Sequence, residues 1–302
     1  MDELVSDALL ALGTVQWGLP YGIANRTGQP RAQEVSEMID LARASSITTL
    51  DTARAYGESE AVIGRVVGDD PFFQVVTKTD PGILEGAPSE HEAVARLLDS
   101  LATSRALLGR RLDTVLLHRP EQRVALGGAV WNALVEERER GNVDRIGISA
   151  LSPEDAFAGL EDPNVTVMQV ASSLLDRRLH EQGFFKAAQA RGVEVHVRSV
   201  FLQGSAFLPS DALPPGLAPL APSIRLLDEL AEGLEVPRPV LFWAWARELG
   251  ASRLLVGCER VEQLQDHLRW FKDASIIGLA VRRTADLLPE LGADVLDPSQ
   301  WS

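Results

Sequence analysis

The sequence predicts an α/β protein of the (β/α)8 TIM-barrel class, folded as a single domain over residues 1–302. Apolar runs of strand length alternate with segments of helical periodicity almost from end to end. Eight such runs, each followed by at least one helical segment, suit a barrel of this kind. A doubly wound open sheet is the alternative. We favour the barrel because no glycine-rich dinucleotide motif follows the first strand and no change in composition marks a domain boundary.

The eight expected strands are short apolar stretches that end in polar or glycine-containing segments. The fourth, for example, reads Leu-Asp-Thr-Val-Leu-Leu and leads directly into His118. In chain order the expected strands are residues 9–17, 47–53, 73–79, 112–117, 143–149, 165–171, 193–200 and 252–258.

The helices between the strands are expected from apolar side chains that recur every three or four residues. In segment 31–45 these are Val35, Met38, Ile39 and Ala42, which fall on one face of a helix. In chain order the expected helices are residues 31–45, 58–67, 90–108, 130–140, 153–160, 183–191, 224–233, 240–249 and 261–271.

Two long loops interrupt this alternation. Residues 17–30 follow the first strand, and the Pro- and Gly-rich residues 201–223 follow the seventh. Loops of this length in a compact domain are usually functional or disordered. Both follow the carboxyl ends of strands, where barrel enzymes place their sites. The C-terminal tail, residues 275–302, contains a helix-like stretch at 283–291 and carries Trp301 near its end.

Composition narrows the class of protein. The chain has 302 residues and 45% hydrophobic content, enough to bury a large core. Cys258 is the one cysteine, so neither an internal disulfide nor a cysteine-based metal site is expected, and a reducing compartment is favoured. The first four residues lack the basic start of a signal peptide, and no run of about 18 apolar residues occurs. A net charge of −14 argues against nucleic acid or anionic membrane as partners, so we expect a cytoplasmic protein.

Four polar residues lie at or just after the carboxyl ends of three successive expected strands. Asp51 and Tyr56 belong to the end of the second strand and the turn after it, Lys78 to the end of the third, and His118 directly follows the fourth. Carboxyl ends of barrel strands meet at one rim, so these side chains are expected to face one mouth. Each has a structural alternative: Asp51 as a turn cap, Tyr56 as an ordinary tyrosine, Lys78 as a strand-end charge, His118 as a rim histidine. Their joint placement favours a proton-transfer set.

The chemistry of such a set follows from the residue types. A tyrosine normally ionises near pH ~10, which makes it a weak acid at neutral pH. An ammonium held close favours the phenolate, and Asp51 is expected to keep Lys78 charged and fixed. Tyr56 then becomes the general acid, and His118 is expected to orient a substrate oxygen.

Several segments, in order along nearly the whole chain, resemble the aldo-keto reductases. They include Leu-Gly-Thr-Val-Gln-Trp-Gly at 12–18, Asp-Thr-Ala-Arg-Ala-Tyr-Gly-Glu-Ser-Glu at 51–60, Val-Thr-Lys-Thr at 76–79, Leu-Leu-His-Arg-Pro at 116–120 and Val-Gly-Cys-Glu-Arg-Val-Glu-Gln-Leu at 256–264. The resemblance implies a barrel enzyme that binds NADPH (NADP+) without a Rossmann domain. It also implies that Tyr56 protonates the carbonyl oxygen of an aldehyde or ketone while hydride reaches the carbon.

By the same resemblance, particular residues match the cofactor site. Asp51, with Gly13 and Thr14 at the end of the first strand, matches positions beside the cofactor. Ser149 and Gln169 match positions that bind the nicotinamide carboxamide, and residues 199–204 match the loop over the pyrophosphate. Residues 257–267 match the site of the adenosine and its 2′-phosphate. The implied cofactor contacts are Gly13, Thr14, Asp51, Ser149, Gln169, Arg198, Ser199, Phe201, Gln203, Gly204, Gly257, Cys258, Arg260, Gln263 and His267.

The chain departs from the family pattern at some of these positions. Ala150 stands where an asparagine usually follows the serine, and Arg198 where many members stack an aromatic ring on the nicotinamide. Gly257 and Gln263 stand where some members have lysine and arginine. Glu259 adds a negative charge near the expected phosphate, and Arg260 is the cation that would compensate. NADPH is expected, with NADH as the alternative.

For the substrate, Trp17, Tyr21 and Arg119 are expected to line the pocket, with the loop after Phe201. Arg119, and Arg54 beside the acid, would suit a carboxylate or phosphate, although both also fit a structural role. Two other functions stay open: a slow or non-catalytic NADP(H)-sensing module, and an NAD-linked alcohol or sugar dehydrogenase. The expected partner is a small carbonyl compound, and the expected assembly is a monomer or a small homo-oligomer.

Overall fold

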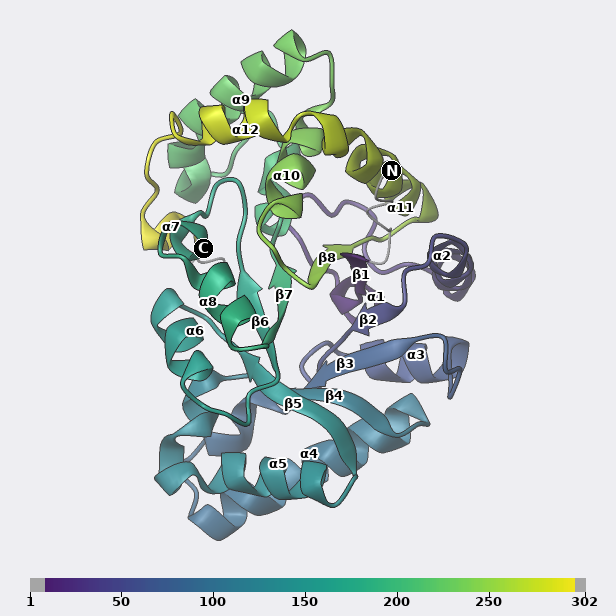
Figure 1. Ribbon diagram of the computed structural model, residues 1–302. Coiled ribbons are helices and arrows are strands. Elements are labelled where there is room, and N and C mark those ends of the chain that lie inside the picture. Colours follow the sequence, from purple (N-terminus) through teal and green to yellow (C-terminus); the bar gives the residue numbers. More distant parts are fainter. Residues whose placement is uncertain (1–8, 297–302) are drawn as a thin grey trace.

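A computed structural model of the chain describes residues 9–296, and its core is a closed barrel of eight parallel strands (Figure 1). The strands follow one another in chain order, and the barrel closes where the first pairs with the eighth. The predicted barrel and all eight strand positions are confirmed. The strands are β1 (Leu10–Gly13), β2 (Thr49–Asp51), β3 (Gln74–Lys78), β4 (Leu112–Leu117), β5 (Val143–Ser149), β6 (Val167–Ala171), β7 (Glu194–Arg198) and β8 (Arg253–Gly257).

The register of the strands brings their carboxyl ends to one rim. Gly13 pairs with Asp51 across β1 and β2, and with Gly257 across β1 and β8. Ser149 pairs with Gln169 across β5 and β6. Each of these residues is at the carboxyl end of its strand or close to it. The polar side chains expected at the strand ends are therefore collected around a single mouth.

Helices cover the outside of the barrel and bury their apolar faces against it. Helix α2 does so with Val35, Met38, Ile39 and Ala42, the face that the periodicity predicts. The other helical segments are longer or shorter by a few residues than predicted, while two agree in full. The helices are α1 (Val15–Gly18), α2 (Ala32–Ala44), α3 (Ser59–Val66), α4 (Glu90–Leu108), α5 (Ala129–Glu139), α6 (Pro153–Leu160), α7 (Arg178–Glu181), α8 (Phe184–Ala190), α9 (Ala221–Gly233), α10 (Arg238–Arg247), α11 (Val261–Asp273), α12 (Gly278–Ala285) and α13 (Ala293–Leu296).

The ends of α4 show why its bounds are readable from the sequence. The Ser89 hydroxyl accepts the backbone N–H of Glu92, whose carboxylate accepts the N–H of Ser89 in return. This reciprocal capping box satisfies two N–H groups that the first turn would otherwise leave unpaired. At the other end Gly109 takes a left-handed conformation with φ 66°, which glycine adopts without strain and which stops the helix.

The first strand is shorter than predicted. β1 ends at Gly13, and the segment from Val15 to Gly18 forms helix α1 instead of continuing the strand. Gly18 lies so close to the turn after β2 that an added Cβ would be 1.8 Å from the carbonyl oxygen of Tyr56. No side chain fits at this contact. The close approach ties the first loop to the turn that carries Tyr56.

The second long loop and the tail also differ from prediction. Within residues 201–223, two 3-10 helices, η5 (Leu202–Phe207) and η6 (Pro215–Leu220), replace an irregular loop. In the tail, helix α12 lies earlier than the predicted 283–291, and residues 286–292 form a turn, a bend and irregular chain. Trp301 lies outside the described residues.

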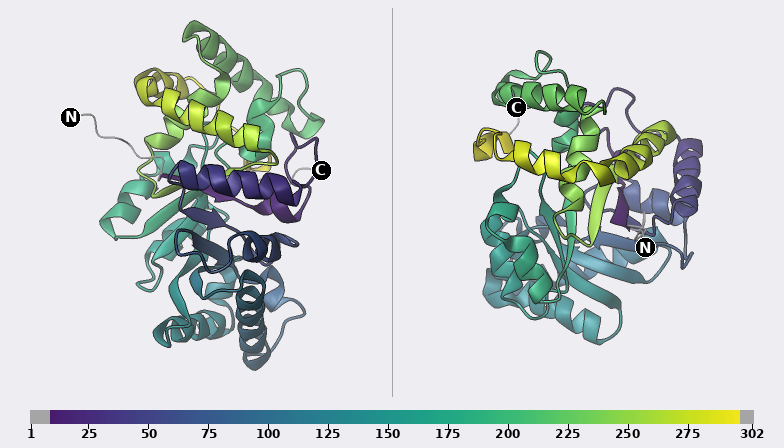
Figure 2. Two further views of the ribbon diagram at one scale, coloured as in Figure 1. Left: turned by 90° about the vertical axis from the view of Figure 1, so that its right-hand side faces the viewer. Right: turned by 45° about the horizontal axis from the view of Figure 1, so that its top comes forward.

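The remaining architecture separates two groups of helices. Helix α10 packs against α9, α11 and α12, and these helices gather in one region of the molecule, away from α4 and α5 (Figure 2).

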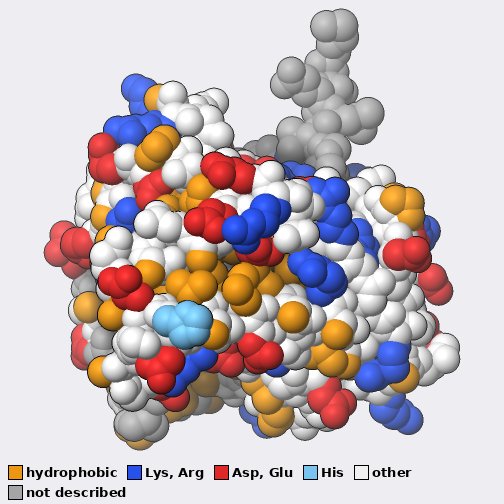
Figure 3. Space-filling model, turned by 90° about the horizontal axis from the view of Figure 1, so that it is seen from below, with side chains coloured by type: hydrophobic (Ala, Val, Ile, Leu, Met, Phe, Trp, Pro, Cys, Tyr) orange, Lys and Arg blue, Asp and Glu red, His pale blue; other side chains and the backbone are white. Residues whose placement is uncertain are grey.

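On the face seen in Figure 3, acidic and basic side chains are interspersed around a small group of hydrophobic ones. This face has no continuous basic surface. In residues 9–296 no helix combines the length and hydrophobicity needed to cross a membrane.

Candidate active site

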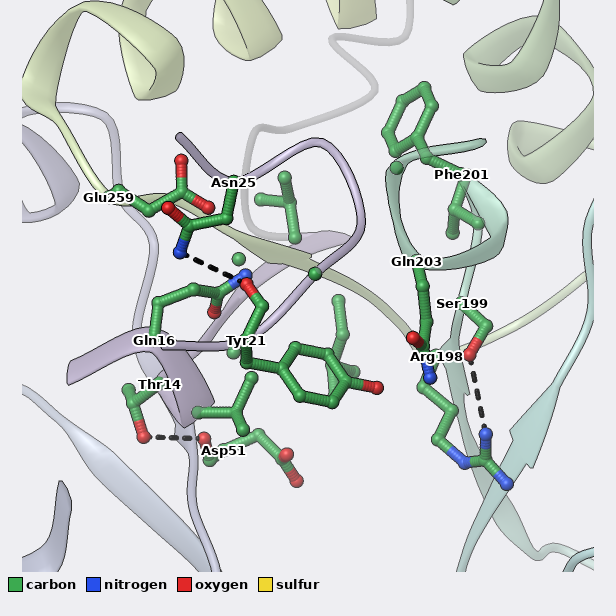
Figure 4. A pocket seen from close by; sticks show the side chains of 18 of the residues that line it. Thr14, Gln16, Tyr21, Asn25, Asp51, Arg198, Ser199, Phe201, Gln203 and Glu259 are labelled. Carbon is green, nitrogen blue, oxygen red and sulfur yellow. Dashed lines mark hydrogen bonds between the residues drawn. The ribbon is translucent and has the colours of Figure 1, made fainter. Parts of the chain in front are cut away.

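A cavity of about 800 Å³ lies at the carboxyl rim of the barrel, a volume within the ~300–1,000 Å³ range of ligand sites (Figure 4). Strand ends and the two long loops supply its lining. Most residues that the sequence predicts as site residues are brought together here. They are Gly13, Thr14, Tyr21, Asp51, Tyr56, His118, Arg119, Ser149, Gln169, Arg198, Ser199, Phe201, Gln203, Gly204, Gly257, Gln263 and His267.

The ammonium of Lys78 lies beneath this lining, 1% exposed, and is held by three acceptor oxygens. Its Nζ donates to Asp51 Oδ1 at 3.0 Å and Oδ2 at 2.8 Å, and to the Thr52 carbonyl at 2.9 Å. Burial alone lowers the pKa of Lys78, but the neighbouring Asp51 and Tyr56 outweigh burial, and the pKa is raised overall. The ammonium is therefore charged at all ordinary pH values.

Tyr56 lies over this ammonium. Its hydroxyl oxygen is 3.4 Å from Lys78 Nζ, and the ammonium is 4.9 Å from the centre of the phenol ring. The turn that carries Tyr56 is narrow: Gly57 has φ 56°, and a Cβ there would be 2.4 Å from the carbonyl oxygen of Gly18. Glycine is thus needed at 57 for both conformation and space.

Buried hydroxyl groups anchor the same turn to β1. The Thr14 hydroxyl donates to the carbonyl oxygen of Asp51 at 2.8 Å, and the Ser59 hydroxyl donates to the Thr14 carbonyl at 2.9 Å. Thr52 Oγ1 donates to Ser59 Oγ at 2.9 Å. Because all four residues are buried, these bonds fix the strand ends that present Asp51 and Tyr56.

His118 follows β4 and meets Tyr56 edge to face, with ring centroids 6.1 Å apart. Its backbone N–H donates to Thr79 Oγ1 at 3.2 Å, which fixes the residue at the end of the strand. Burial, and to a smaller extent the cations of Lys78, Arg119 and Arg198, together lower the pKa of His118 to about 3. The imidazole is therefore neutral at physiological pH, so one ring nitrogen donates a hydrogen bond and the other accepts.

Gln169 offers a polar atom to a ligand. Its Nε2 donates to Asp51 Oδ1 at 2.6 Å, while its buried Oε1 has no hydrogen-bond partner within the described chain. Ser149, its neighbour across β5 and β6, lines the same cavity. An unpaired buried carbonyl oxygen is costly unless a ligand N–H meets it, so this pair fits an amide such as the nicotinamide carboxamide.

A second part of the cavity is formed by β8, the start of α11 and the loop after β7. Phe201 and Trp270 have ring centroids 5.0 and 5.3 Å from that of His267. Burial lowers the pKa of His267 to about 3, so this ring is neutral as well. These aromatic faces suit a flat heteroaromatic ring such as adenine. The carboxylate-bearing residues Glu259 and Asp266 line the same part.

Four predicted site residues do not line the cavity. Lys78 lies behind Asp51 and Tyr56, as its proposed role requires. Trp17 was expected in the substrate pocket, but helix α1 turns it into the hydrophobic core, where it is 4% exposed. Cys258 is also buried, which raises the pKa of its thiol. Arg260 is exposed at the start of α11.

Arg54 is occupied by a structural contact. Its Nη1 is 2.6 Å from Oε2 of Glu60, and Glu60 Oε1 accepts from the Thr77 hydroxyl at 2.6 Å. Arg54 is not part of the cavity lining, so the structural interpretation of this residue holds.

Sequence reasoning missed several lining residues. Gln16 is one: its side-chain amide lies against Gly257, where an added Cβ would be 2.4 Å from its Oε1. A Gln inside the expected first strand carries no signal of its own, and only the close glycine contact reveals its place. The other missed lining residues include Val15, Gly22, Ala24, Asn25, Leu151, Phe207, Leu255, Val256 and Trp270.

Comparison with known proteins agrees with this architecture. Two solved structures described as putative aldo-keto reductases from Pseudomonas aeruginosa resemble it, with TM-scores of 0.64 and 0.63. Each is 21% identical in sequence, and each alignment covers 88% of this chain and 90% of the other, a likeness that concerns the fold. A search of curated proteins finds no match. The family model described as "Aldo/keto reductase family" matches residues 9–275, and the chain belongs to the aldo/keto reductase family.

Proposed function

We propose that the chain is an NADPH-dependent carbonyl reductase that converts an aldehyde or ketone to the alcohol. Family membership supports an oxidoreductase in general. The observation that carries the finer proposal is the contact of 3.4 Å between the Tyr56 hydroxyl and the Lys78 ammonium, at the wall of a ligand-sized cavity.

Tyr56 is the proposed general acid. As hydride reaches the carbonyl carbon, the oxygen gains negative charge and takes the phenolic proton. The phenolate that remains lies beside the Lys78 ammonium, whose own charge is held by Asp51 at 2.8 Å. A fixed cation in a buried site stabilises the developing anion without reorganisation at the moment of reaction.

His118 is the proposed orienting residue. It is neutral, lines the cavity and lies edge to face with Tyr56. A neutral imidazole donates one hydrogen bond, which suits a carbonyl oxygen held between His118 and Tyr56. A charged imidazolium would compete with Tyr56 as the proton donor, and the low pKa of His118 removes that competition.

The cofactor, when bound, supplies the hydride. The unpaired Oε1 of Gln169, with Ser149 beside it, fits the carboxamide of the nicotinamide. The aromatic part of the cavity around His267 fits the adenine. Because hydride must reach a carbon next to Tyr56, the nicotinamide belongs with the β2–β6 rim, which leaves the β8–α11 part for the adenosine.

We propose that discrimination between NADPH and NADH is weak. The N–H groups at the start of α11 and the exposed Arg260 favour a 2′-phosphate. The carboxylates of Glu259 and Asp266, which line that part of the cavity, oppose it. The two effects have opposite sign, so a preference for NADPH is expected to be small.

The test is substitution of Tyr56 by phenylalanine, which removes the hydroxyl and keeps the ring. The variant should bind NADPH as the wild type does, while turnover of a panel of aldehydes falls by about 10²–10⁴-fold. Loss of nicotinamide absorbance measures turnover, and fluorescence titration measures cofactor binding. The proposal fails if the variant reduces those aldehydes as fast as the wild-type protein does.

A further inference from the structure

Two arginine side chains at the cavity have no acidic partner in the described part of the chain, residues 9–296. Arg119 follows His118 at the end of β4, and Arg198 ends β7. The guanidinium of Arg198 donates only to neutral acceptors, to Ser199 Oγ and to the Ala150 carbonyl, both at 3.3 Å. Arg198 lines the cavity, and Figure 4 shows its guanidinium next to the Ser199 hydroxyl. Neither arginine makes an ion pair within 4.0 Å in residues 9–296.

The other cations near this rim are already neutralised. Lys78 is paired with Asp51 at 2.8 Å, and Arg54 is paired with Glu60 at 2.6 Å. The proposed catalytic His118 is neutral. Since these groups balance one another, Arg119 and Arg198 leave an excess of positive charge at this part of the cavity. The excess contrasts with a net charge of −14 for the whole chain.

The positive charges of both guanidinium groups are felt at His118, the residue beside which the substrate carbonyl is expected. After burial and Lys78, they are the next causes that lower the pKa of His118 to about 3. Tyr21 lies in the same region: burial first, then Tyr56, raises its pKa to about 12, while Arg198 opposes the rise. Figure 4 shows the Tyr21 ring pointing across the cavity on the side of Arg198. The Tyr21 hydroxyl is thus a neutral donor on the side of the Arg198 cation.

We propose that the substrate is a carbonyl compound that carries a carboxylate or phosphate group, bound by Arg119 and Arg198 with the Tyr21 hydroxyl as a further donor. This inference rests on the proposed reductase function and deepens it. A planar guanidinium binds oxyanions through two parallel N–H groups, and hydrogen bonds between charged groups are about twice as strong as neutral ones. An arginine that faces neutral carbonyl and hydroxyl groups retains this capacity.

The cofactor is the competing anion for Arg198. A pyrophosphate reaching the end of β7 would occupy that guanidinium, and Arg119 alone would then meet the substrate. The two cases differ in what a substitution at Arg198 changes: the affinity for the cofactor, or the preference among substrates. The test therefore measures both quantities for each variant.

The test uses three aldehydes of one shape: 4-formylbenzoate, 4-formylphenyl phosphate and the neutral methyl 4-formylbenzoate. For the wild-type protein, kcat/KM for the better anionic aldehyde should exceed that for the ester by about 10–100-fold, as expected for charge-assisted hydrogen bonds. Calorimetry of the same three compounds with the NADP+-loaded protein measures binding where no reaction occurs. Whichever anionic aldehyde the protein binds and reduces better, the carboxylate or the phosphate, identifies the anionic group that the natural substrate carries.

Arg119→Gln and Arg198→Gln should each reduce the ratio of anionic to neutral kcat/KM by about tenfold, and the corresponding lysine variants should recover part of it. Arg65→Gln, an exposed arginine on α3 that does not line the cavity, is the control and should leave the ratio unchanged.

Equal kcat/KM and equal binding for the ester and both anions overturn the inference while the reductase proposal stands. No turnover of any aldehyde counts against the proposed function, and calorimetry still decides the inference. A change in NADPH affinity alone in Arg198→Gln assigns this arginine to the cofactor and overturns its role here.

Discussion

The hydroxyl of Tyr56, in the turn after β2, lies 3.4 Å from the ammonium of Lys78 at the end of β3, and the two residues are 22 positions apart in the chain. The contact exists because β2 and β3 are adjacent, so that Asp51 pairs with Val76 and the next residues form one wall. Lys78 is 1% exposed, and its charge is compensated only by groups in the same wall. The proposed proton donation and the stability of the fold therefore depend on the same buried ion pair.

This dependence predicts two separable effects. Lys78→Met leaves the Asp51 carboxylate buried without its cation and should lower the free energy of unfolding by about 3–5 kcal/mol. Reductase activity should disappear. Denaturant unfolding followed by circular dichroism measures the first effect, and aldehyde turnover measures the second.

The double variant Asp51→Asn with Lys78→Met is the matched control. Without either charge, no ion is left unpaired, and most of the lost stability should return. Activity should remain absent because the phenolate has no cation. A double variant as unstable as Lys78→Met would show that packing of the lysine stem, and not the charge pair, stabilises this wall.

A second prediction concerns the pH dependence of stability. Burial lowers the pKa of His267 to about 3, below its ordinary value of 6.5. Between these values the unfolded chain binds the proton and the folded chain does not, so unfolding takes up protons. The free energy of unfolding should fall as the pH drops from about 6.5 toward 3, with His118 contributing in the same window for the same reason.

The measurement is urea unfolding at a series of pH values for the wild type and for His267→Phe. The aromatic replacement keeps a ring among Phe201, Trp243 and Trp270 but cannot take up a proton. In this variant the free energy of unfolding should fall less steeply between about pH 6.5 and pH 3 than in the wild type. If the free energy of unfolding depends on pH equally in the two proteins, His267 takes up its proton in the folded state and the prediction is wrong.

A third prediction concerns the opposite end of the barrel, where β7 begins. Glu194 Oε1 lies 2.9 Å from His196 Nε2, and its other oxygen lies 2.6 Å from Arg145. The hydrogen bond with His196, together with nearby cations, lowers the pKa of Glu194 to about 2. A lowered carboxyl pKa stabilises the fold above the ordinary value of about 4.5, and this stability is lost as the pH falls from there toward 2.

Glu194→Gln should therefore cost about 1–2 kcal/mol at pH 7, a value reduced for the partial exposure of this side chain, and less at pH 3. Turnover should be unaffected, because Glu194 lies at the start of its strand, away from the cavity. Thermal unfolding at the two pH values measures the stability term. Equal losses at pH 7 and pH 3 would contradict an electrostatic origin.

Much of the fold and the proposed catalytic residues were predictable from the sequence. Bounds of β4, β5, α4 and α6 agree with prediction because the apolar pattern and the capping residues coincide at their ends. Asp51, Tyr56, Lys78 and His118 were predictable as a group because strand ends of a barrel converge. The contact between Tyr56 and Lys78 follows from topology rather than from sequence distance.

Other features depend on contacts that no local pattern contains. Helix α1 has four residues, too few for a periodicity, and so the burial of Trp17 could not be anticipated. Arg54 and Arg119 both follow strands and look alike in the sequence. The ion pair between Arg54 and Glu60, which no local pattern indicates, distinguishes the two arginines. The place of Gln16 depends on the missing side chain of Gly257 in a neighbouring strand.

A fourth prediction concerns the choice between NADPH and NADH. Glu259 is 9% exposed, lines the β8–α11 part of the cavity and accepts a hydrogen bond from Gln263 Nε2 at 2.6 Å. A carboxylate there repels a 2′-phosphate but not the 2′-hydroxyl of NADH. Glu259→Gln keeps the shape and a polar group while removing the charge. It should tighten NADPH binding by about 5–10-fold and change NADH binding by less than about twofold, as expected for one charge interaction of about 1 kcal/mol.

Arg260→Ala should act in the opposite direction and weaken NADPH more than NADH, because the exposed guanidinium at the start of α11 is the proposed compensating cation. Glu262→Gln, an exposed acid in the first turn of the same helix that does not line the cavity, is the matched control for a general change in charge. Fluorescence titration of both cofactors against all three variants gives the affinity ratios. Equal gains for NADPH and NADH in Glu259→Gln would mean that the adenosine does not occupy the β8–α11 part of the cavity, because the two cofactors differ only in the 2′-phosphate.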